Sequence, residues 1–451
     1  MTDRQESEAA RPAGAIGLWS GIGLGIANMV GVGVLTSNGY MARALGPGAI
    51  LAIWLIQGLL ALAGARTYAA LATLKPSSGG EYRYLSEFLH PAWGAFAGWT
   101  SVVVGFAAPV AANAYAVAAF LKELVPGVPT LPMATAVVVL FTFAAAGRLT
   151  LAKGSQDALV LVKLALLTGF VILGLVRGQH EWPAGAAADA GRGSVTAFGM
   201  NLYYAAYAYS GWNAAVYVAS AFRSPARTVP RAMVGATLLV TAFYLVMAFV
   251  FIANLSGDDL GGWSENRVTL AHLLVQKLAG PRAAVVVSVG IILVLGSCIS
   301  AMMLTGPAVS SAMASDGFLP RWLAGDGVHP KASAVVLQGG LALVLLWTSS
   351  FDKLIAGMGV VLTASSALCA LALLRVARRR ESGVAPIARI AAAVFLVAAS
   401  AEVVMAIWIF PRALVWLAGL GILTAFGYRR AMSARVARDR QAVAGAGGGN
   451  A

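Results

Sequence analysis

Charged residues are scarce in this chain, and their scarcity decides the environment in which it folds. Asp, Glu, Lys and Arg make up 11% of the 451 residues, whereas about a quarter of the residues in a soluble domain are charged. Hydrophobic residues make up 59%, and the mean hydropathy is +0.79. An ordinary soluble fold is therefore excluded, and a membrane is expected. Segments of about ten residues with alternating polarity are missing too, which excludes a membrane β-barrel.

Cysteine and histidine are equally rare, and this excludes further classes of protein. The two cysteines, Cys298 and Cys369, fall in different apolar segments, so we expect small packing residues and no disulfide framework. The four histidines, which lie at segment ends or in loops without metal-ligand spacing, are His90, His180, His272 and His329. We therefore expect no enzyme activity, no metal site and no cofactor.

Acidic residues are outnumbered by basic ones, 18 against 32, which gives a formal net charge of +14. Such an excess could indicate nucleic-acid binding, so its distribution matters. If the N-terminus is cytoplasmic, most lysines and arginines fall in loops on that side, including the cluster at 375–380. This positive-inside bias predicts a multi-pass protein of the cell (inner) membrane with both termini in the cytoplasm and no nucleic-acid partner.

Long apolar segments occupy most of the chain, and each is long enough for a membrane helix of about 20 residues. The twelve expected helices span 16–42, 47–74, 92–121, 130–148, 155–176, 196–221, 231–254, 284–313, 333–349, 353–375, 387–408 and 410–428. The polar start at 1–15 shows no cleavable signal, so we expect the first helix to be retained. The Gly- and Ala-rich end at 441–451 predicts disorder.

Two glycines in the first apolar segment stand in the run "MVGVGVL". Gly31 and Gly33 are two residues apart, so they point about 200° away from each other on a helix, and each costs about 1 kcal/mol there. Close packing between helices is the simpler explanation of such glycines, and it fits Gly17 and Gly21 on one face. The pair at 31 and 33 is better suited to a break, with a second half-helix beginning at Val34.

A second interruption lies in the middle of the segment at 196–221. Ser210 and Gly211 are flanked by aromatic residues, and Asn213 follows two positions later. Interrupted helices at corresponding positions of two sets of five helices are typical of transporter sites. The ends of half-helices offer N–H groups to an anion and carbonyls to a cation, so a zwitterion fits such a site.

Four motifs resemble those of the amino acid-polyamine-organocation transporters. They are "GVGVL" in the first helix, "KPSSGGEYRYLSEFLHPAWGAFAGW" after the second, "YAYSGWNAAVY" followed by "RSPARTVPRA" in the sixth, and "ASDGFLP" after the eighth. The match runs from about residue 16 to 430, and "SGWN" resembles the L-type and neutral amino acid branches most. The resemblance implies an all-α polytopic protein with the leucine-transporter fold of about twelve transmembrane helices.

This fold implies five parts. They are a cytoplasmic segment at 1–15, a first inverted repeat at 16–176, a second at 196–375, two added helices at 387–428, and a cytoplasmic tail at 429–451. The resemblance also implies roles for individual residues. The substrate carboxylate would meet the backbone N–H groups of Val32, Gly33 and Val34. The ammonium would meet carbonyls near Met29, Val30, Tyr207, Ala208 and Ser210. Tyr207 would be the aromatic gate over the substrate.

Some positions depart from the family pattern. Val32 stands where serine is common, which leaves backbone donors alone to hold the carboxylate. Asn213 stands where several relatives are acidic, which argues against strongly cationic substrates. Ala70, Ala221 and Ala308 replace charged residues near the inner face, which predicts either looser gating there or slow transport.

Lys163 is the most informative charge inside an expected helix. A charged residue at a membrane-helix centre costs at least about 2.5 kcal/mol on insertion scales, so it favours a functional role. The resemblance implies that its ammonium replaces the sodium of sodium-coupled relatives, bound by first-helix carbonyls and by hydroxyls such as Ser297 or Ser300. A group in that place could load and release a proton. The alternative is a side chain that snorkels toward the inner end of its helix.

These features predict a secondary transporter that works by alternating access. Its substrates would be small or medium neutral L-amino acids, and it would be a proton symporter or an exchanger that does not use sodium. Its partners would be the amino acid, protons and the lipid bilayer. Transport of organic amines or polyamines remains an alternative, as does an amino acid sensor that does not transport. A channel is excluded because the intramembrane polar residues are too few to line a pore.

Overall fold

The computed structural model is helical throughout the part of the chain that it describes. That part covers residues 16–125, 127–147, 153–178, 195–255, 259, 270–326, 330–349, 351–379, 383–409, 411 and 413–447. The helices in chain order are α1 (Leu18–Met29), α2 (Val32–Ala44), α3 (Pro47–Leu74), α4 (Glu81–Phe88), α5 (Pro91–Trp99), the π-helical η2 (Thr100–Ala107), α6 (Ala108–Leu124), α7 (Thr130–Ala146), α8 (Lys153–Arg177), α9 (Val195–Tyr209), α10 (Ala214–Tyr217), the 3-10 helix η3 (Ala219–Ala221), α11 (Pro225–Asn254), α13 (Leu270–Ser315), η4 (Arg321–Leu323), α14 (Ala332–Thr348), α15 (Phe351–Ala377), α16 (Pro386–Ile409) and α17 (Ala413–Gly447).

Several of these helices can cross a membrane. Within the described residues, seven helical segments are long and apolar enough, or eight if the bent pair α1 and α2 counts as one span. Shorter apolar helices, among them α7 and α14, add to these. A polytopic helical membrane fold, as the composition predicts, is therefore confirmed.

The first apolar segment is broken between α1 and α2. The two half-helices meet at Val30 and Gly31, where the backbone is extended, and their axes differ by 51°. The glycine pattern predicts a second half beginning at Val34, whereas the structure begins it at Val32. Gly33 therefore lies in the first turn of α2, where a Cβ would come within 2.8 Å of the Ala208 Cα atom. Gly31 belongs to the break, and Gly33 allows close packing against α9.

The sixth apolar segment is broken as its sequence predicts. A turn over residues 210–213 separates α9 from the single turn of α10. Gly211 has a φ of +104°, which side chains rarely adopt, and a Cβ there would lie 2.9 Å from the carbonyl carbon and oxygen of Asn28. The two broken helices are thus packed backbone against backbone.

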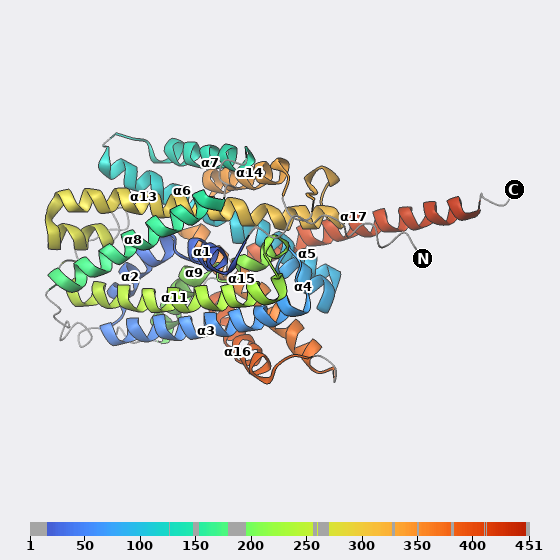
Figure 1. Ribbon diagram of the computed structural model, residues 1–451, viewed down its shortest axis with the longest axis horizontal. Helices are drawn as coiled ribbons and strands as arrows, with labels where there is room; N and C mark the ends of the chain where they lie inside the picture. The colour runs from blue at the N-terminus through green and yellow to red at the C-terminus, as the bar shows by residue number, and fades with distance from the viewer. Residues whose placement is uncertain are drawn as a thin grey trace.

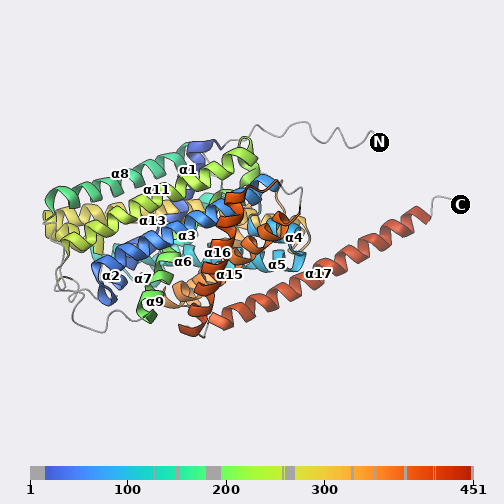
Figure 2. The same cartoon turned by 90° about the horizontal axis from the view of Figure 1, so that it is seen from below.

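Long helices enclose the two breaks. The helices α3 and α11 run side by side, α13 passes along the opposite side, and α16 packs against α3 and α15 (Figure 1). The helix α17 projects beyond the end of the molecule formed by α4 and α5 (Figure 2). It continues to Gly447, so the predicted disorder from 441 does not hold for residues 441–447. Alanine and arginine in this tail favour a helix.

The end of the molecule near α4 is held by polar contacts. Arg83 forms an ion pair with Asp316 just beyond α13, and the Tyr82 hydroxyl donates to the same carboxylate. Beside them, the Ile16 N–H donates to the Ala221 carbonyl at 3.1 Å, and the Arg223 N–H donates to the Ile16 carbonyl at 3.0 Å. The alanines at 221 and 308 predict looser gating, but a charged contact is present at this end between α4 and the end of α13.

The contact between the breaks generates a prediction. We expect Gly211→Ala to lower the stability of the purified protein by about 1–3 kcal/mol, because the residue would be strained and its Cβ would press on Asn28. Thermal unfolding in detergent measures this loss. Gly340→Ala is the matched control, because a Cβ at this helical position meets nothing within 4 Å. Equal melting temperatures for the two variants would contradict the close packing of the breaks.

Candidate functional site

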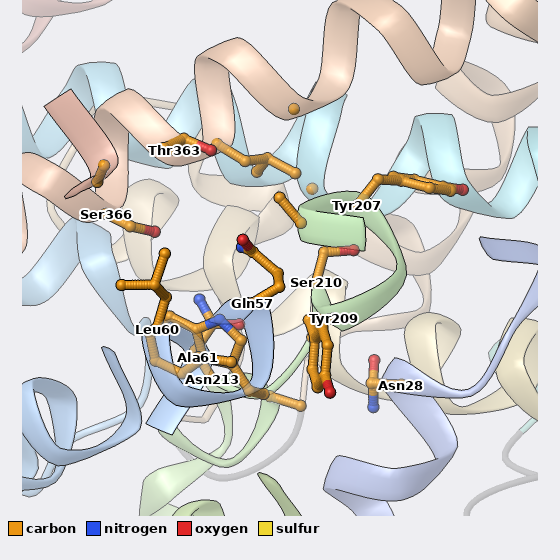
Figure 3. Close-up of a pocket in the computed structure, with 18 of the residues that line it drawn as sticks. Asn28, Gln57, Leu60, Ala61, Tyr207, Tyr209, Ser210, Asn213, Thr363 and Ser366 are labelled. Carbon is orange, nitrogen blue, oxygen red and sulfur yellow. The ribbon is translucent and has the colours of Figure 1, made fainter. Parts of the chain in front are cut away.

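A cavity of about 90 Å³ lies beside the α9–α10 break (Figure 3). It is lined by the turn at 210–213 and by residues of α1, α3, α4, η2, α9, α10, α13, α15 and α16. Its polar lining residues are Asn28, Gln57, Glu81, Tyr207, Tyr209, Ser210, Asn213, Tyr217, Thr363, Ser366 and Glu402. Several polar groups therefore converge on one enclosed space, as in the binding sites of small molecules.

The cavity gathers part of the predicted site. Tyr207, Ser210 and Asn213 line it, and so does Gly211. The other predicted binding residues are buried in the packing between helices and do not line it: Met29, Val30, Val32, Gly33, Val34 and Ala208. The structure thus brings three of the predicted binding residues, all from the sixth apolar segment, to the cavity, while the first helix contributes Asn28 to its lining.

The ammonium group of Lys163 binds backbone carbonyls at the C-terminal end of α1. Its side chain is 1% exposed, and its Nζ atom donates to the carbonyl oxygens of Ala27 at 3.1 Å and Val30 at 2.8 Å. These carbonyls belong to the last turn of α1 and to its C-cap residue, where the helix dipole favours a cation. The side chain therefore does not snorkel, and it reaches the first helix as the resemblance implies.

One of the two predicted partners of Lys163 in α13 is not bound to it. Ser297 is buried, and its hydroxyl has no hydrogen-bond partner within the described part of the chain, so it does not bind Lys163. Ser300 is also buried on the same helix. Cys298 on α13 is close enough to interact electrostatically with the ammonium, and its Sγ lies 3.8 Å from the Asn28 carbonyl oxygen.

Tyr244 on α11 joins the two breaks. Its hydroxyl lies 3.0 Å from the carbonyl oxygen of Met29 and 3.0 Å from that of Ala208. These carbonyls have lost helical partners at the breaks, and burying them without a donor is costly in a membrane. The role of Tyr244 is missed in the sequence because a tyrosine in an apolar helix looks like any packed aromatic residue.

Asn113 on α6 supports the opposite side of the first break. Its Oδ1 atom accepts from the Val32 N–H at 3.2 Å, and its Nδ2 atom donates to the Pro109 carbonyl at 2.7 Å. The Val32 N–H, a predicted donor to the substrate carboxylate, is therefore occupied by Asn113 in this structure. An asparagine within an apolar segment is the sequence signal that could have identified this residue.

Glu81 forms a hub at the start of α4. Its carboxylate accepts hydrogen bonds from four neutral groups, the side chains of Tyr68, Asn213, Ser365 and Ser366. Burial raises the pKa of the Glu81 carboxyl, and these hydrogen bonds oppose the rise. The hub links α3, α4 and α15 to the turn at 210–213. The carboxylate lies within the motif "GGEYRY", whose glycines indicate the turn but not the partner.

Two interrupted membrane helices that meet beside a buried polar cavity define a membrane transporter. The family model described as amino acid permease matches residues 16–423. The chain therefore belongs to the amino acid permease family of the amino acid-polyamine-organocation superfamily, whose members are transporters and not enzymes.

Similar proteins include several amino acid transporters. The serine/threonine exchanger SteT of Bacillus subtilis is 28% identical over 355 residues, which cover 75% of this chain and 79% of the exchanger. The human large neutral amino acids transporter small subunit 2 is 26% identical over 382 residues, 79% of this chain and 70% of the relative. An uncharacterized transporter of Mycobacterium bovis is 30% identical over 323 residues, 70% of this chain and 69% of the relative.

The bridge between the breaks can be tested on Tyr244. We expect Tyr244→Phe to slow uptake into proteoliposomes severalfold and to lower stability by about 1–3 kcal/mol, because the one hydroxyl proton that the two buried carbonyls share is removed. Tyr203→Phe is the control: Tyr203 is also buried, but its hydroxyl accepts from the Gly359 N–H, away from both breaks. If both variants transport alike, the bridge has no part in transport.

The Glu81 hub makes a separate prediction about stability. In Glu81→Gln an amide NH₂ would face groups that donate to the carboxylate, so we expect a loss of about 1–3 kcal/mol in thermal unfolding. Glu87→Gln on the same helix is the matched control. Glu87 is half exposed and pairs with Lys75, so its replacement should change stability by less than about 1 kcal/mol. Similar losses in the two variants would contradict the hub.

Proposed function

We propose that this protein is a sodium-independent secondary transporter of small or medium neutral L-amino acids that works by alternating access. Its helices would form the twelve-helix leucine-transporter fold, with inverted repeats at 16–176 and 196–375 and added helices at 387–428. The bias of lysines and arginines toward one side supports a location in the cell's inner membrane with both termini in the cytoplasm.

The observation that carries the proposal is the meeting of the two breaks beside a polar cavity. The N-terminus of α2 carries partial positive charge, which suits a carboxylate, and the carbonyl ends of α1 and α9 suit an ammonium. A free amino acid presents both groups. The printed names of two relatives, a serine/threonine exchanger and a large neutral amino acids transporter, support the same class of substrate.

Substrate binding would use groups that are now held by side chains. The carboxylate would lie at the N–H groups of Val32, Gly33 and Val34, with Asn113 releasing the first of them. The ammonium would share the carbonyls of Met29, Val30, Tyr207, Ala208 and Ser210, since each carbonyl oxygen can accept two hydrogen bonds. Tyr207, which lines the cavity, would be the gate.

Sodium independence rests on Lys163. Its ammonium is a fixed cation at the carbonyl end of α1, bound to two backbone oxygens. Carbonyl oxygens are also ligands that sodium takes in transporters with broken helices. Lys163 would thus replace the ion, with Ser300 of the neighbouring helix α13 as the remaining hydroxyl that the resemblance implies. Release of its proton during the cycle would make the protein a symporter, and retention would make it an exchanger or facilitator.

The test is uptake of a panel of neutral amino acids and a matching amine into proteoliposomes. We expect unchanged uptake when choline replaces sodium, because the ammonium is part of the chain. Lys163→Met should lose at least about tenfold, since two charge-assisted hydrogen bonds disappear. Lys122→Met, at an exposed position of α6, should transport normally.

The same assay contains the outcomes that would overturn the proposal. Strict sodium dependence would remove the role of Lys163 as a replacement ion. Uptake at two external pH values separates a symporter from an exchanger. Equal competition by an amino acid and its decarboxylated amine would show that the carboxylate is not recognised. Binding without uptake of any compound would indicate a sensor.

A further inference from the structure

A second buried carboxylate, Glu402 on α16, lines the cavity. Its side chain is 8% exposed. One hydrogen bond reaches it, from the side chain of Gln57. Its Oε1 atom has no hydrogen-bond partner among the described residues. A carboxylate with a bare oxygen in a membrane interior is costly, so a residue of this kind points to a function.

Gln57 on α3 is also a buried side chain with an unpartnered acceptor oxygen among the described residues. It is 7% exposed, and its side chain extends into the cavity that Ser210 and Thr363 also line (Figure 3). Its amide group donates to Glu402, while its Oε1 atom is a second buried acceptor without a donor in the described part of the chain. Two side chains that line the same cavity thus each have a buried acceptor oxygen without a donor among the described residues.

Glu81 and Glu402 differ in the number of hydrogen-bond donors that reach their carboxylates. Glu81 lies in the same cavity lining but already accepts from four side chains. Glu402 has a single donor, and none of the ion pairs formed within the described residues involves it. The need for a donor is therefore confined to the α3–α16 side of the cavity.

We propose that Glu402 and Gln57 form a subsite for a second ammonium group of the substrate. An ammonium carries three donors and a positive charge, so one group can serve both free acceptors and neutralise the carboxylate. The inference rests on the proposed transport of amino acids and extends its substrates to those with an amino group at the end of the side chain, such as ornithine.

This subsite changes the interpretation of Asn213. An asparagine at a position that is acidic in several relatives argues against cationic substrates when it is considered alone. In the structure, Asn213 donates to Glu81 at 3.1 Å and lines the cavity together with Glu402. The negative charge that a cationic side chain requires is present, but α16 supplies it from outside the two expected repeats.

Three ligands of matched shape test the proposal. Norleucine has a methyl group where ornithine has an ammonium, and putrescine is ornithine without its carboxylate. Their binding is measured by competition on the purified full-length protein and as uptake into proteoliposomes. We expect the wild type to bind ornithine about tenfold more tightly than norleucine, as expected for a charge-assisted hydrogen bond. In Glu402→Gln this ratio should fall to about one, while norleucine binds as before.

Two further variants complete the design. Glu87→Gln removes an exposed carboxylate from α4 and should keep the wild-type ratio. Gln57→Leu removes one of the two acceptors and should lower the ratio part of the way, so the proposal stays testable if Glu402→Gln does not fold. Monodispersity on gel filtration identifies the variants that are compared.

Each outcome decides a separate point. Equal binding of ornithine and norleucine by the wild type would overturn the subsite, as would a ratio that survives Glu402→Gln. A loss of norleucine uptake in Glu402→Gln without any change in the ratio would mean that Glu402 holds a proton for coupling, and this also overturns it. If the wild type transports no amino acid, the proposed function fails. The subsite is then supported by putrescine binding that depends on Glu402, and overturned without it.

Discussion

The arrangement of this protein depends on the backbone groups that two broken helices leave without partners inside a membrane. At the first break the carbonyls of Ala27, Val30 and Met29 lie near the end of α1, and at the second Ala208 precedes the turn. Lipid offers no hydrogen bonds, so the protein must supply them. Lys163, Tyr244 and Asn113 do so from three different helices, α8, α11 and α6. The packing of these helices around the breaks is therefore set by the geometry of the unwound backbone.

The polar cavity follows from this arrangement. Because the backbones of the two breaks touch at Gly211 and Asn28, the turn at 210–213 leaves the helical path and opens a space toward α3, α15 and α16. Polar side chains on those helices can then face one another away from lipid. The Glu81 carboxylate accepts hydrogen bonds there from α3, α15 and the turn at 210–213. Glu402 and Gln57 each have an acceptor oxygen that receives no hydrogen bond from the described residues.

The features that are rare in membrane helices can be recognised from the sequence. Gly31 and the pair Ser210 and Gly211 indicated the breaks because glycine is costly there, and Lys163 was found because a buried charge is unusual. The start of α2 was misplaced by two residues, because backbone propensity alone does not show that Gly33 packs on Ala208. The roles of Tyr244, Asn113, Glu81 and Glu402 were missed. Each depends on a partner more than ten residues away in the chain, and helical periodicity contains no information about such partners.

The parallel bridge between Ile16 and Phe222 has a mechanical consequence. Two backbone hydrogen bonds tie Ile16, two residues before α1, to Ala221 at the end of η3 and to Arg223, so the ends of the two broken segments that lie away from the breaks are fastened to each other. Side chains are not needed for this link, and it can vary in sequence without being lost. A tilt of α1 that keeps these bonds must carry the end of the sixth segment with it.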